Sequence, residues 1–260
     1  MTKRRYLGQH YLADPSVIRL MVETSGVRER ERLLEIGTGR GALTRELGKL
    51  SRSFEAFELD EDNYVATKEL GIDGLDLHLG DAFSERPVFD VLVSSLPYSE
   101  SSNFVEWLSK LHYDRAVVML QKDFVEKLMA KPGSDRYRAV SVISQISSEI
   151  SIVREVGRDS FDPPPRVSSV LVTIRLRSII TPHRIRIIKM LFSQKRKTLT
   201  GAMRRLGLEL TPGIEPELRS RRVQQISAGE IEGLLGQIES SSRAKIIPDG
   251  GPGERRANEL

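Results

Sequence analysis

The sequence predicts an α/β fold, in which a doubly wound parallel sheet is followed by a small helical domain at the C-terminus. Strand-like apolar runs alternate with helical patterns from Arg32 onward, and a glycine-rich turn follows the first run. After Thr181-Pro182 the pattern becomes helical throughout. The expected parts are a sheet domain over 1–180 with an arm over 1–14, a basic helical domain over 181–240, and a disordered tail over 241–260.

The elements of the sheet domain follow in chain order. A first helix is expected to begin at Pro15 with Asp14 as its N-cap, because proline fits the first turn of a helix. Strands are then expected at 32–37, 54–59, 75–81, 90–97 and 115–120. The expected helices lie at 42–50, 61–70, 101–111 and 123–130. Such alternation implies parallel pairing of the strands.

The later part of the chain is less regular. Residues 139–146 fit either a helix or a strand, whereas 150–156 and 167–176 are strand-like and can add an antiparallel pair. Between them lies Phe161-Asp162-Pro163-Pro164-Pro165-Arg166, whose prolines force an extended connection. Helices are expected over 184–207, 215–222 and 228–238, and the tail contains too few apolar residues to pack.

Composition narrows the possible classes of protein. The chain has no cysteine, which excludes disulfides, thiolate metal sites and a cysteine nucleophile. Its histidines are scattered, so no zinc site or other metal site is expected: His10, His78, His112 and His183. No apolar run approaches the roughly 18 residues of a membrane span. We therefore expect a soluble, cytoplasmic protein, with a monomer as the simplest state.

Charge is unevenly distributed along the chain. The net charge is +4, but residues 175–222 contain 13 Lys and Arg against 3 Asp and Glu, a net of +10, which leaves −6 for the remainder. A basic segment attached to a mildly acidic body predicts a contact with a polyanion such as nucleic acid. The alternative is a basic helix face that is merely solvated.

The glycine-rich turn lies within Leu33–Thr44, which reads LLEIGTGRGALT. Its G-x-G-x-G spacing differs from the G-x-G-x-x-G of dinucleotide enzymes and from the lysine-containing phosphate loop. Glu35 precedes the glycines and the loop carries no lysine, which fits the S-adenosylmethionine loop of Rossmann-like methyltransferases better. The alternative is a strand-to-helix turn that needs glycine for its geometry alone.

Acidic side chains follow the next two strands. Ligands bind at the carboxyl ends of the strands in open α/β sheets. Glu58 ends the second strand, where a carboxylate can accept both hydroxyls of a ribose, and Asp81 follows the third, where it can accept an adenine amine. Each could instead be a helix cap or a solvated loop residue. For Asp60 we favour the cap.

The tetrad Ser95-Leu96-Pro97-Tyr98 ends the fourth strand. Proline turns the backbone sharply and leaves the carbonyl of Leu96 free to face a pocket, while Tyr98 can stack on a base. This arrangement suits a flipped-out purine whose amine faces a methyl donor. The alternative is an ordinary strand-ending turn.

Taken together, these motifs resemble the small-subunit ribosomal RNA adenine dimethyltransferase family, of the archaeal and eukaryotic type. The similar blocks occur in order along the chain: LGQHYLAD, LLEIGTGRGALT, FELDED, GDAF, SLPY, QKDFVEKLMAKPGSDRYRAVSV, FDPPPRVSSV and LFSQKRKTL. The resemblance implies a Rossmann-like class I methyltransferase sheet. It also implies transfer of two methyl groups from S-adenosyl-L-methionine to N6 of two adjacent adenosines in small-subunit ribosomal RNA, with the small ribosomal subunit as partner.

The resemblance also implies roles for particular residues. The cofactor would be bound by Gln9, His10, Leu12, Gly37, Gly39, Glu58, Leu59, Asp81, Ala82 and Ser95. The target adenine would be held for catalysis by Ser95, Leu96, Pro97, Tyr98 and Phe161, with the two aromatic rings sandwiching the base. The basic helices would contact RNA through Lys195, Arg196, Lys197, Arg204, Arg205, Arg221 and Arg222.

Two departures from the family pattern stand out. Ser95 occupies a position that is usually asparagine, and Arg138-Ala139 replaces the more frequent Gly-Arg. Serine reaches less far than asparagine, so the chain could be a slower enzyme, or could rely on Ser94 or water. Two alternatives stay open: a catalytically weak or inactive assembly factor that docks on the small subunit, and a related methyltransferase with another RNA or DNA substrate.

Overall fold

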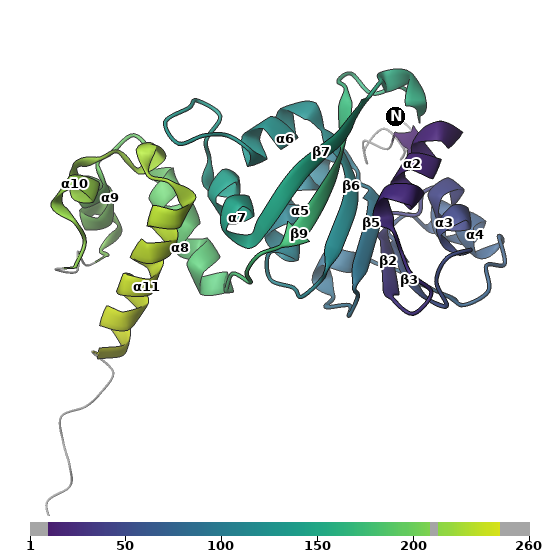
Figure 1. The fold of residues 1–260 in the computed structure, drawn as a ribbon, viewed down its shortest axis with the longest axis horizontal. Helices are drawn as coiled ribbons and strands as arrows, with labels where there is room; N and C mark the ends of the chain where they lie inside the picture. The colour runs from purple at the N-terminus through teal and green to yellow at the C-terminus, as the bar shows by residue number, and fades with distance from the viewer. Residues whose placement is uncertain (1–9, 209–212, 245–260) are drawn as a thin grey trace, which may run out of the picture.

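The structure, a computed structural model, describes residues 10–208 and 213–244. Its centre is a seven-stranded sheet (Figure 1) with the order β4-β3-β2-β5-β6-β9-β7. In that order the strands are Leu75–Leu79, Ser53–Glu58, Arg32–Ile36, Val91–Ser95, Arg115–Gln121, Ser169–Leu176 and Ser148–Val156. The predicted doubly wound α/β fold is confirmed, because β4, β3, β2, β5 and β6 pair in parallel.

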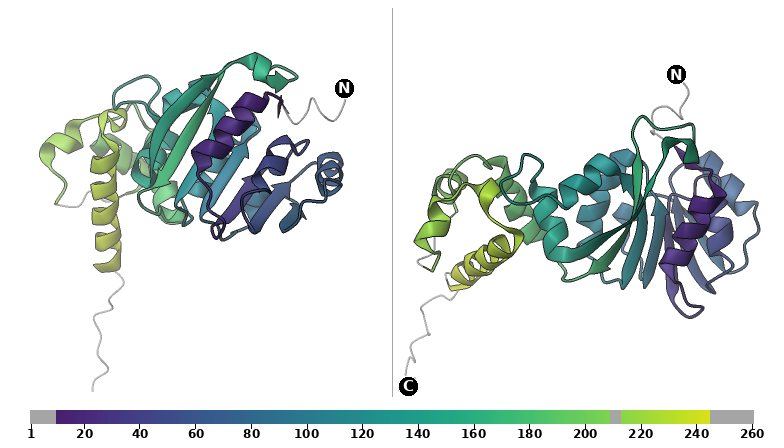
Figure 2. Two further views of the ribbon diagram at one scale, coloured as in Figure 1. Left: turned by 45° about the vertical axis from the view of Figure 1, so that its right-hand side comes forward. Right: turned by 45° about the horizontal axis from the view of Figure 1, so that its top comes forward.

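Helices cover both faces of this sheet (Figure 2). They are α2 (Pro15–Ser25), α3 (Ala42–Leu47), α4 (Glu61–Lys68), α5 (Ser101–Leu108), α6 (Lys122–Leu128) and α7 (Ala139–Ser147). The predicted cap of α2 is confirmed, since the Asp14 carboxylate accepts a hydrogen bond from the Ser16 amide at 2.8 Å. The ambiguous segment 139–146 is helical because Val142, Ile143 and Ile146 then face the core together.

Strand residues alternate between two apolar layers, as the pleat of a sheet requires. Val91, Val93 and Val117 pack with residues of α2 and α3. Leu92 and Val118 point the other way and pack with α5, α6 and α7. Both layers are closed to water, so apolar burial on both faces stabilises the parallel strands.

The late strands form the predicted antiparallel pair. β9 pairs antiparallel with β6 on one side and with β7 on the other. The connection between β7 and β9 contains one further strand, which lies directly before the three prolines. Phe161–Asp162 forms a short strand, β8, which pairs with β1 (Tyr11–Leu12) from the N-terminal arm.

The C-terminal helices gather at one end of the molecule, beside α7 (Figure 1). They are α8 (Pro182–Ser193), α9 (Leu199–Leu206), α10 (Pro216–Ser220) and α11 (Ala228–Ala244). The single helical stretch expected over 184–207 is wrong. The chain breaks after Ser193 and restarts at Thr198, whose hydroxyl caps α9 by accepting from the Gly201 amide at 3.2 Å.

The division of the chain is less sharp at the C-terminus than the sequence suggests. One apolar cluster runs from Val118 in the sheet through Leu191 of α8 to Ile231 of α11. α11 also continues past residue 240, so the first residues of the expected disordered tail are helical. The remainder of that tail lies outside the described residues, and the boundaries near 180 and 240 stay predictions.

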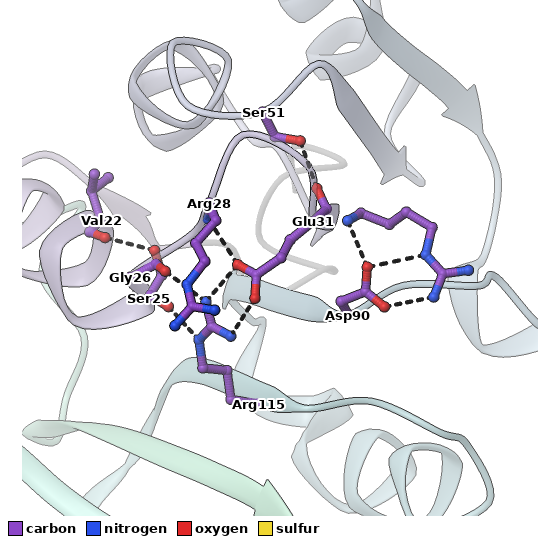
Figure 3. Close-up of polar contacts among 9 residues, drawn as sticks. Val22, Ser25, Gly26, Arg28, Glu31, Ser51, Asp90 and Arg115 are labelled. Atoms are coloured by element: carbon purple, nitrogen blue, oxygen red, sulfur yellow. Dashed lines mark hydrogen bonds and ion pairs between the residues drawn. The ribbon is translucent and has the colours of Figure 1, made fainter.

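A polar network ties together the amino ends of the central strands (Figure 3). Arg115, at the start of β6, donates to the carbonyl of Ser25 at 2.5 Å and to both carboxylate oxygens of Glu31 at 2.9 and 3.0 Å. Asp90, just before β5, accepts from Arg32 at the start of β2. These contacts lie at the end of the sheet opposite the carboxyl ends of the strands, where the site is found.

Candidate active site

Three adjoining cavities lie along the carboxyl ends of β2, β3 and β5, where the strand order switches direction. The first lies between residues 10–13 of the arm and the glycine turn. The second is small and is bordered by Glu58 and Pro97. The third, of about 420 Å³, is lined by residues that follow β3, β4 and β5. Gly37 borders all three cavities, so they form one elongated groove at the expected ligand-binding edge.

The glycine turn needs its glycines for geometry and for close approach. Gly37 and Gly39 have φ of 75° and 54°, a region that side chains disfavour. A Cβ on Gly39 would lie 2.9 Å from the ring of Tyr11, so the arm approaches the turn closely. The Gly39 amide donates to Glu58 at 2.7 Å. The turn and the carboxylate at the end of β3 are thus held together, as a nucleoside site requires.

Glu58 is buried and lines the second and third cavities. One carboxylate oxygen accepts from the Gly39 amide, and the other accepts from the Asp60 amide at 2.9 Å. Burial raises the pKa of Glu58, while these amide bonds oppose the rise. Carboxylate oxygens have further lone pairs, so both can accept ribose hydroxyls as well.

The third cavity is lined mainly by apolar residues, together with the carboxylates of Glu58, Asp81 and Glu100. Leu59, Asp81 and Ala82, which the sequence predicts as cofactor residues, all line it. Asp81 also acts as a cap, because it accepts from the Phe83 amide at 2.9 Å. Asp60 is the N-cap of α4, as expected. Asp81 is therefore a cap that also lines the third cavity, and its role toward an adenine amine stays a prediction.

The tetrad lies where the cavities meet. Ser95 borders the first two cavities, Leu96 the third, and Pro97 the second and third. Among the described residues, no donor is hydrogen-bonded to the Leu96 carbonyl. Ser94 is buried and donates to the Ile36 carbonyl at 2.6 Å. That bond commits the Ser94 hydroxyl to the sheet, so it is a poor substitute for the shorter reach of Ser95.

The two aromatic residues expected to sandwich a base differ in exposure. Tyr98 is half-buried, and its hydroxyl lies 2.5 Å from that of Ser169 on β9. Burial raises the pKa of Tyr98, so its hydroxyl stays protonated. Phe161 is only 4% exposed and borders none of the three cavities. Its partner in β1 is Leu12, and both side chains belong to one buried apolar cluster, so the arm contributes to burying the ring.

The arm supplies two of the three residues expected from it. His10 and Leu12 line the first cavity, whereas Gln9 lies outside the described residues. Nδ1 of His10 donates to the Pro163 carbonyl at 2.7 Å, and its ring lies 5.7 Å from that of Tyr98. The arm therefore contacts both the first cavity and the ring of Tyr98.

Sequence reasoning used Glu35 to recognise the loop but did not place it among the site residues. Its side chain lines the first cavity, yet the residue is only 1% exposed. Its Oε2 has no hydrogen-bond partner among the described residues. Burial raises the pKa of Glu35 to about 8. The place of Glu35 just before the glycines could have marked it as a site residue. That place does not indicate that its carboxyl group is buried.

The basic residues expected to contact RNA occupy the helical part. Most of them are exposed: Arg196, Lys197, Arg204, Arg205 and Arg222. Arg221 is instead engaged inside the fold, where it pairs with Glu230 at 2.6 Å. Lys195 is half-buried, and burial together with the nearby charge of Arg138 lowers its pKa. Five of these seven basic residues are thus exposed, and Lys195 and Arg221 are the two that are partly buried.

The strand order, the glycine turn and the groove beside it define a Rossmann-like class I methyltransferase. More particularly, the chain belongs to the ribosomal RNA adenine dimethylase family, which it matches over residues 1–211. No helix among the described residues is long and apolar enough to cross a membrane. The same residues contain no cluster of three or more side chains suited to a metal ion.

Relatives and solved structures agree with this assignment. The chain is 35% identical over 206 residues to the probable ribosomal RNA small subunit methyltransferase A of Pyrococcus abyssi, covering 76% of this chain and 74% of the relative. It is 32% identical over 251 residues to the protein of that name from Methanothermobacter thermautotrophicus, covering 92% of each. A dimethyladenosine transferase from Plasmodium falciparum superposes with a TM-score of 0.76 at 24% identity, covering 90% of this chain and 98% of that one, and shows the shared fold.

Proposed function

We propose that this protein transfers methyl groups from S-adenosyl-L-methionine to N6 of two adjacent adenosines in small-subunit ribosomal RNA. The observation that carries the proposal is the continuous groove that passes the tetrad, where the Leu96 carbonyl accepts no hydrogen bond from the described residues. Membership of the family supports the substrate class. We further propose that the chain acts as a monomer in the cytoplasm on the small ribosomal subunit.

The residues of the groove fit the cofactor in three parts. The amino-acid end would lie in the first cavity against Gly37 and Gly39, the ribose on Glu58, and the adenine between Leu59 and Ala82 with its amine near Asp81. When bound, S-adenosylmethionine supplies an activated methyl group on a sulfonium. The positive-φ glycines of the turn and the buried carboxylate of Glu58 suit such a ligand.

Catalysis then rests on alignment more than on acid–base chemistry. The Leu96 carbonyl and the Ser95 hydroxyl would accept hydrogen bonds from the target amine, which favours a tetrahedral nitrogen and offsets the positive charge that develops there. Tyr98 would hold the base on one face. Phe161 can contribute the other face only after its cover by the arm changes, because the ring is buried here.

Undermethylated small subunits incubated with labelled S-adenosylmethionine test the proposal directly. We expect label in N6-dimethyladenosine, and none in subunits that are already methylated. Cofactor binding without any label in adenosine would instead identify a non-catalytic assembly factor. Label in another base would identify a methyltransferase with a different target.

The pH dependence of stability reports on Glu35. Its folded pKa of about 8 lies above the unfolded value of 4.5, so the folded protein holds one proton more than the unfolded chain between these values. The free energy of unfolding should therefore fall as pH rises through that window. Glu35→Gln removes this penalty. We expect the variant to be more stable than the wild type by roughly 4–5 kcal/mol near pH 8.5.

Urea unfolding at about pH 5 and about pH 8.5 measures this difference. Near pH 5 the two proteins should agree closely, because the wild-type carboxyl is then neutral in the fold. The exposed Glu69, changed to glutamine, serves as the control and should show no such pH-dependent gain. Equal stability differences at both pH values would contradict the assignment of a neutral, buried Glu35.

A further inference from the structure

The N-terminal arm and the segment after β7 are joined by backbone and side-chain contacts that close over the first cavity. β1 and β8 pair through Tyr11 with Asp162 and Leu12 with Phe161. The amide of Ala13 donates to the Ser160 carbonyl at 2.9 Å. We call this β1–β8 pair, residues 11–12 with 161–162, the clasp. The clasp holds the arm, which is proposed to close over the cofactor, against Phe161, which is proposed to stack on the target base.

Arg40 connects the clasp to the glycine turn. It follows Gly39 directly, and its guanidinium bonds to the Asp162 carboxylate at 2.9 Å. The same guanidinium lies 4.5 Å from the centre of the Tyr11 ring. One side chain of the cofactor turn thus touches both strands of the clasp, one through charge and the other through an aromatic face.

The contacts are placed so that opening the clasp has two consequences. Arg40 and Asp162 both line the first cavity, so separating them opens the wall of the proposed amino-acid end of the cofactor site. Asp162 is also the neighbour of Phe161, whose buried ring belongs to the same apolar cluster as Leu12, its partner in the arm. Moving β8 away from the arm therefore changes the exposure of Phe161.

We propose that Arg40 and Asp162 form a latch that holds the clasp closed over the cofactor site and thereby links cofactor retention to the covering of Phe161. Arg40 is a positioning residue in this role, because it acts through Tyr11 and Asp162. The inference rests on the proposed cofactor site. The Arg40 and Asp162 side chains are 54% and 62% exposed, so the latch is weak enough to open for exchange of ligand.

Charge reversal tests the latch. Arg40→Glu and Asp162→Arg each place like charges face to face, and each should raise the dissociation constant for S-adenosylhomocysteine about fivefold. The double variant Arg40→Glu/Asp162→Arg restores opposite charges and should return to within about twofold of the wild type. Titration calorimetry on the full chain measures all four proteins. Arg45→Glu, an exposed site on α3, the helix that follows the turn, is the control and should bind as the wild type does.

Hydrogen exchange of peptides that cover residues 10–14 and 160–163 supplies a readout that needs no cofactor. Both single reversals should speed exchange there, and the double variant should restore protection.

In methylation assays the single variants should raise the KM for the cofactor, while kcat changes less than about twofold. A double variant that binds as weakly as the worse single would overturn the latch, because Arg40 would then contact the cofactor itself. Unchanged single variants would overturn it as well. A wild type that binds no S-adenosylhomocysteine would refute the proposed cofactor site, whereas the exchange experiment would still judge the latch.

Discussion

Replacing Tyr98 with alanine is expected to lower kcat/KM for the RNA substrate about 100-fold, while cofactor affinity changes little. Stacking of a base on an aromatic ring contributes about 1–3 kcal/mol, and loss of the ring also leaves the target amine poorly aligned. Tyr98 borders none of the three cavities, so its loss should spare the cofactor. Single-turnover methylation of undermethylated subunits and calorimetry with S-adenosylhomocysteine measure the two effects separately.

Tyr98→Phe is the matched control for this prediction. It keeps the ring and removes only the hydroxyl that lies 2.5 Å from the hydroxyl of Ser169. We expect it to retain activity within about fivefold, since a single neutral hydrogen bond contributes about 1 kcal/mol. If alanine and phenylalanine impaired the enzyme equally, the hydroxyl and not the ring would matter. If neither did, Tyr98 would not contact the target base.

Much of the sheet domain could be predicted because its signals are local. Alternating apolar strands and helical patterns fix the parallel core, and Asp14 and Pro15 mark the start of α2. The break between α8 and α9 was missed because the apolar spacing continues across it. Only the turn at Gln194–Thr198, where the chain bonds to residues near 222, interrupts the helix. Such long-range contacts leave no mark in a periodicity.

The site residues follow the same division. Gly37, Glu58, Asp81 and Ser95 could be placed in one groove from sequence, because each ends or follows a strand of the parallel sheet. The covering of Phe161 could not, since it depends on the arm pairing with a segment about 150 residues away. Nor could the bond between Arg40 and Asp162, because two exposed charges far apart in the chain carry no pattern that links them.

The second large effect is expected at Ser95. Ser95→Asn should raise the rate of methyl transfer about tenfold, because an amide carbonyl reaches further toward the target amine than a hydroxyl does, and such an acceptor stabilises developing charge. Space is available, since Ser95 is half-buried and borders two cavities. Ser94 offers no help in the wild type, because its hydroxyl is bonded to the Ile36 carbonyl. Single-turnover rates at saturating cofactor measure the change.

Two further variants decide what the Ser95 hydroxyl itself contributes. Ser95→Ala should slow the wild-type reaction about tenfold if the hydroxyl accepts from the amine, and should leave the rate unchanged if water already does so. Ser102→Asn adds the same side chain at an exposed position of α5 and should have no effect on the rate. A Ser95→Asn protein that is no faster than the wild type would mean that residue 95 does not limit transfer. The Leu96 carbonyl, which takes no other hydrogen bond among the described residues, would then be the group that governs the amine.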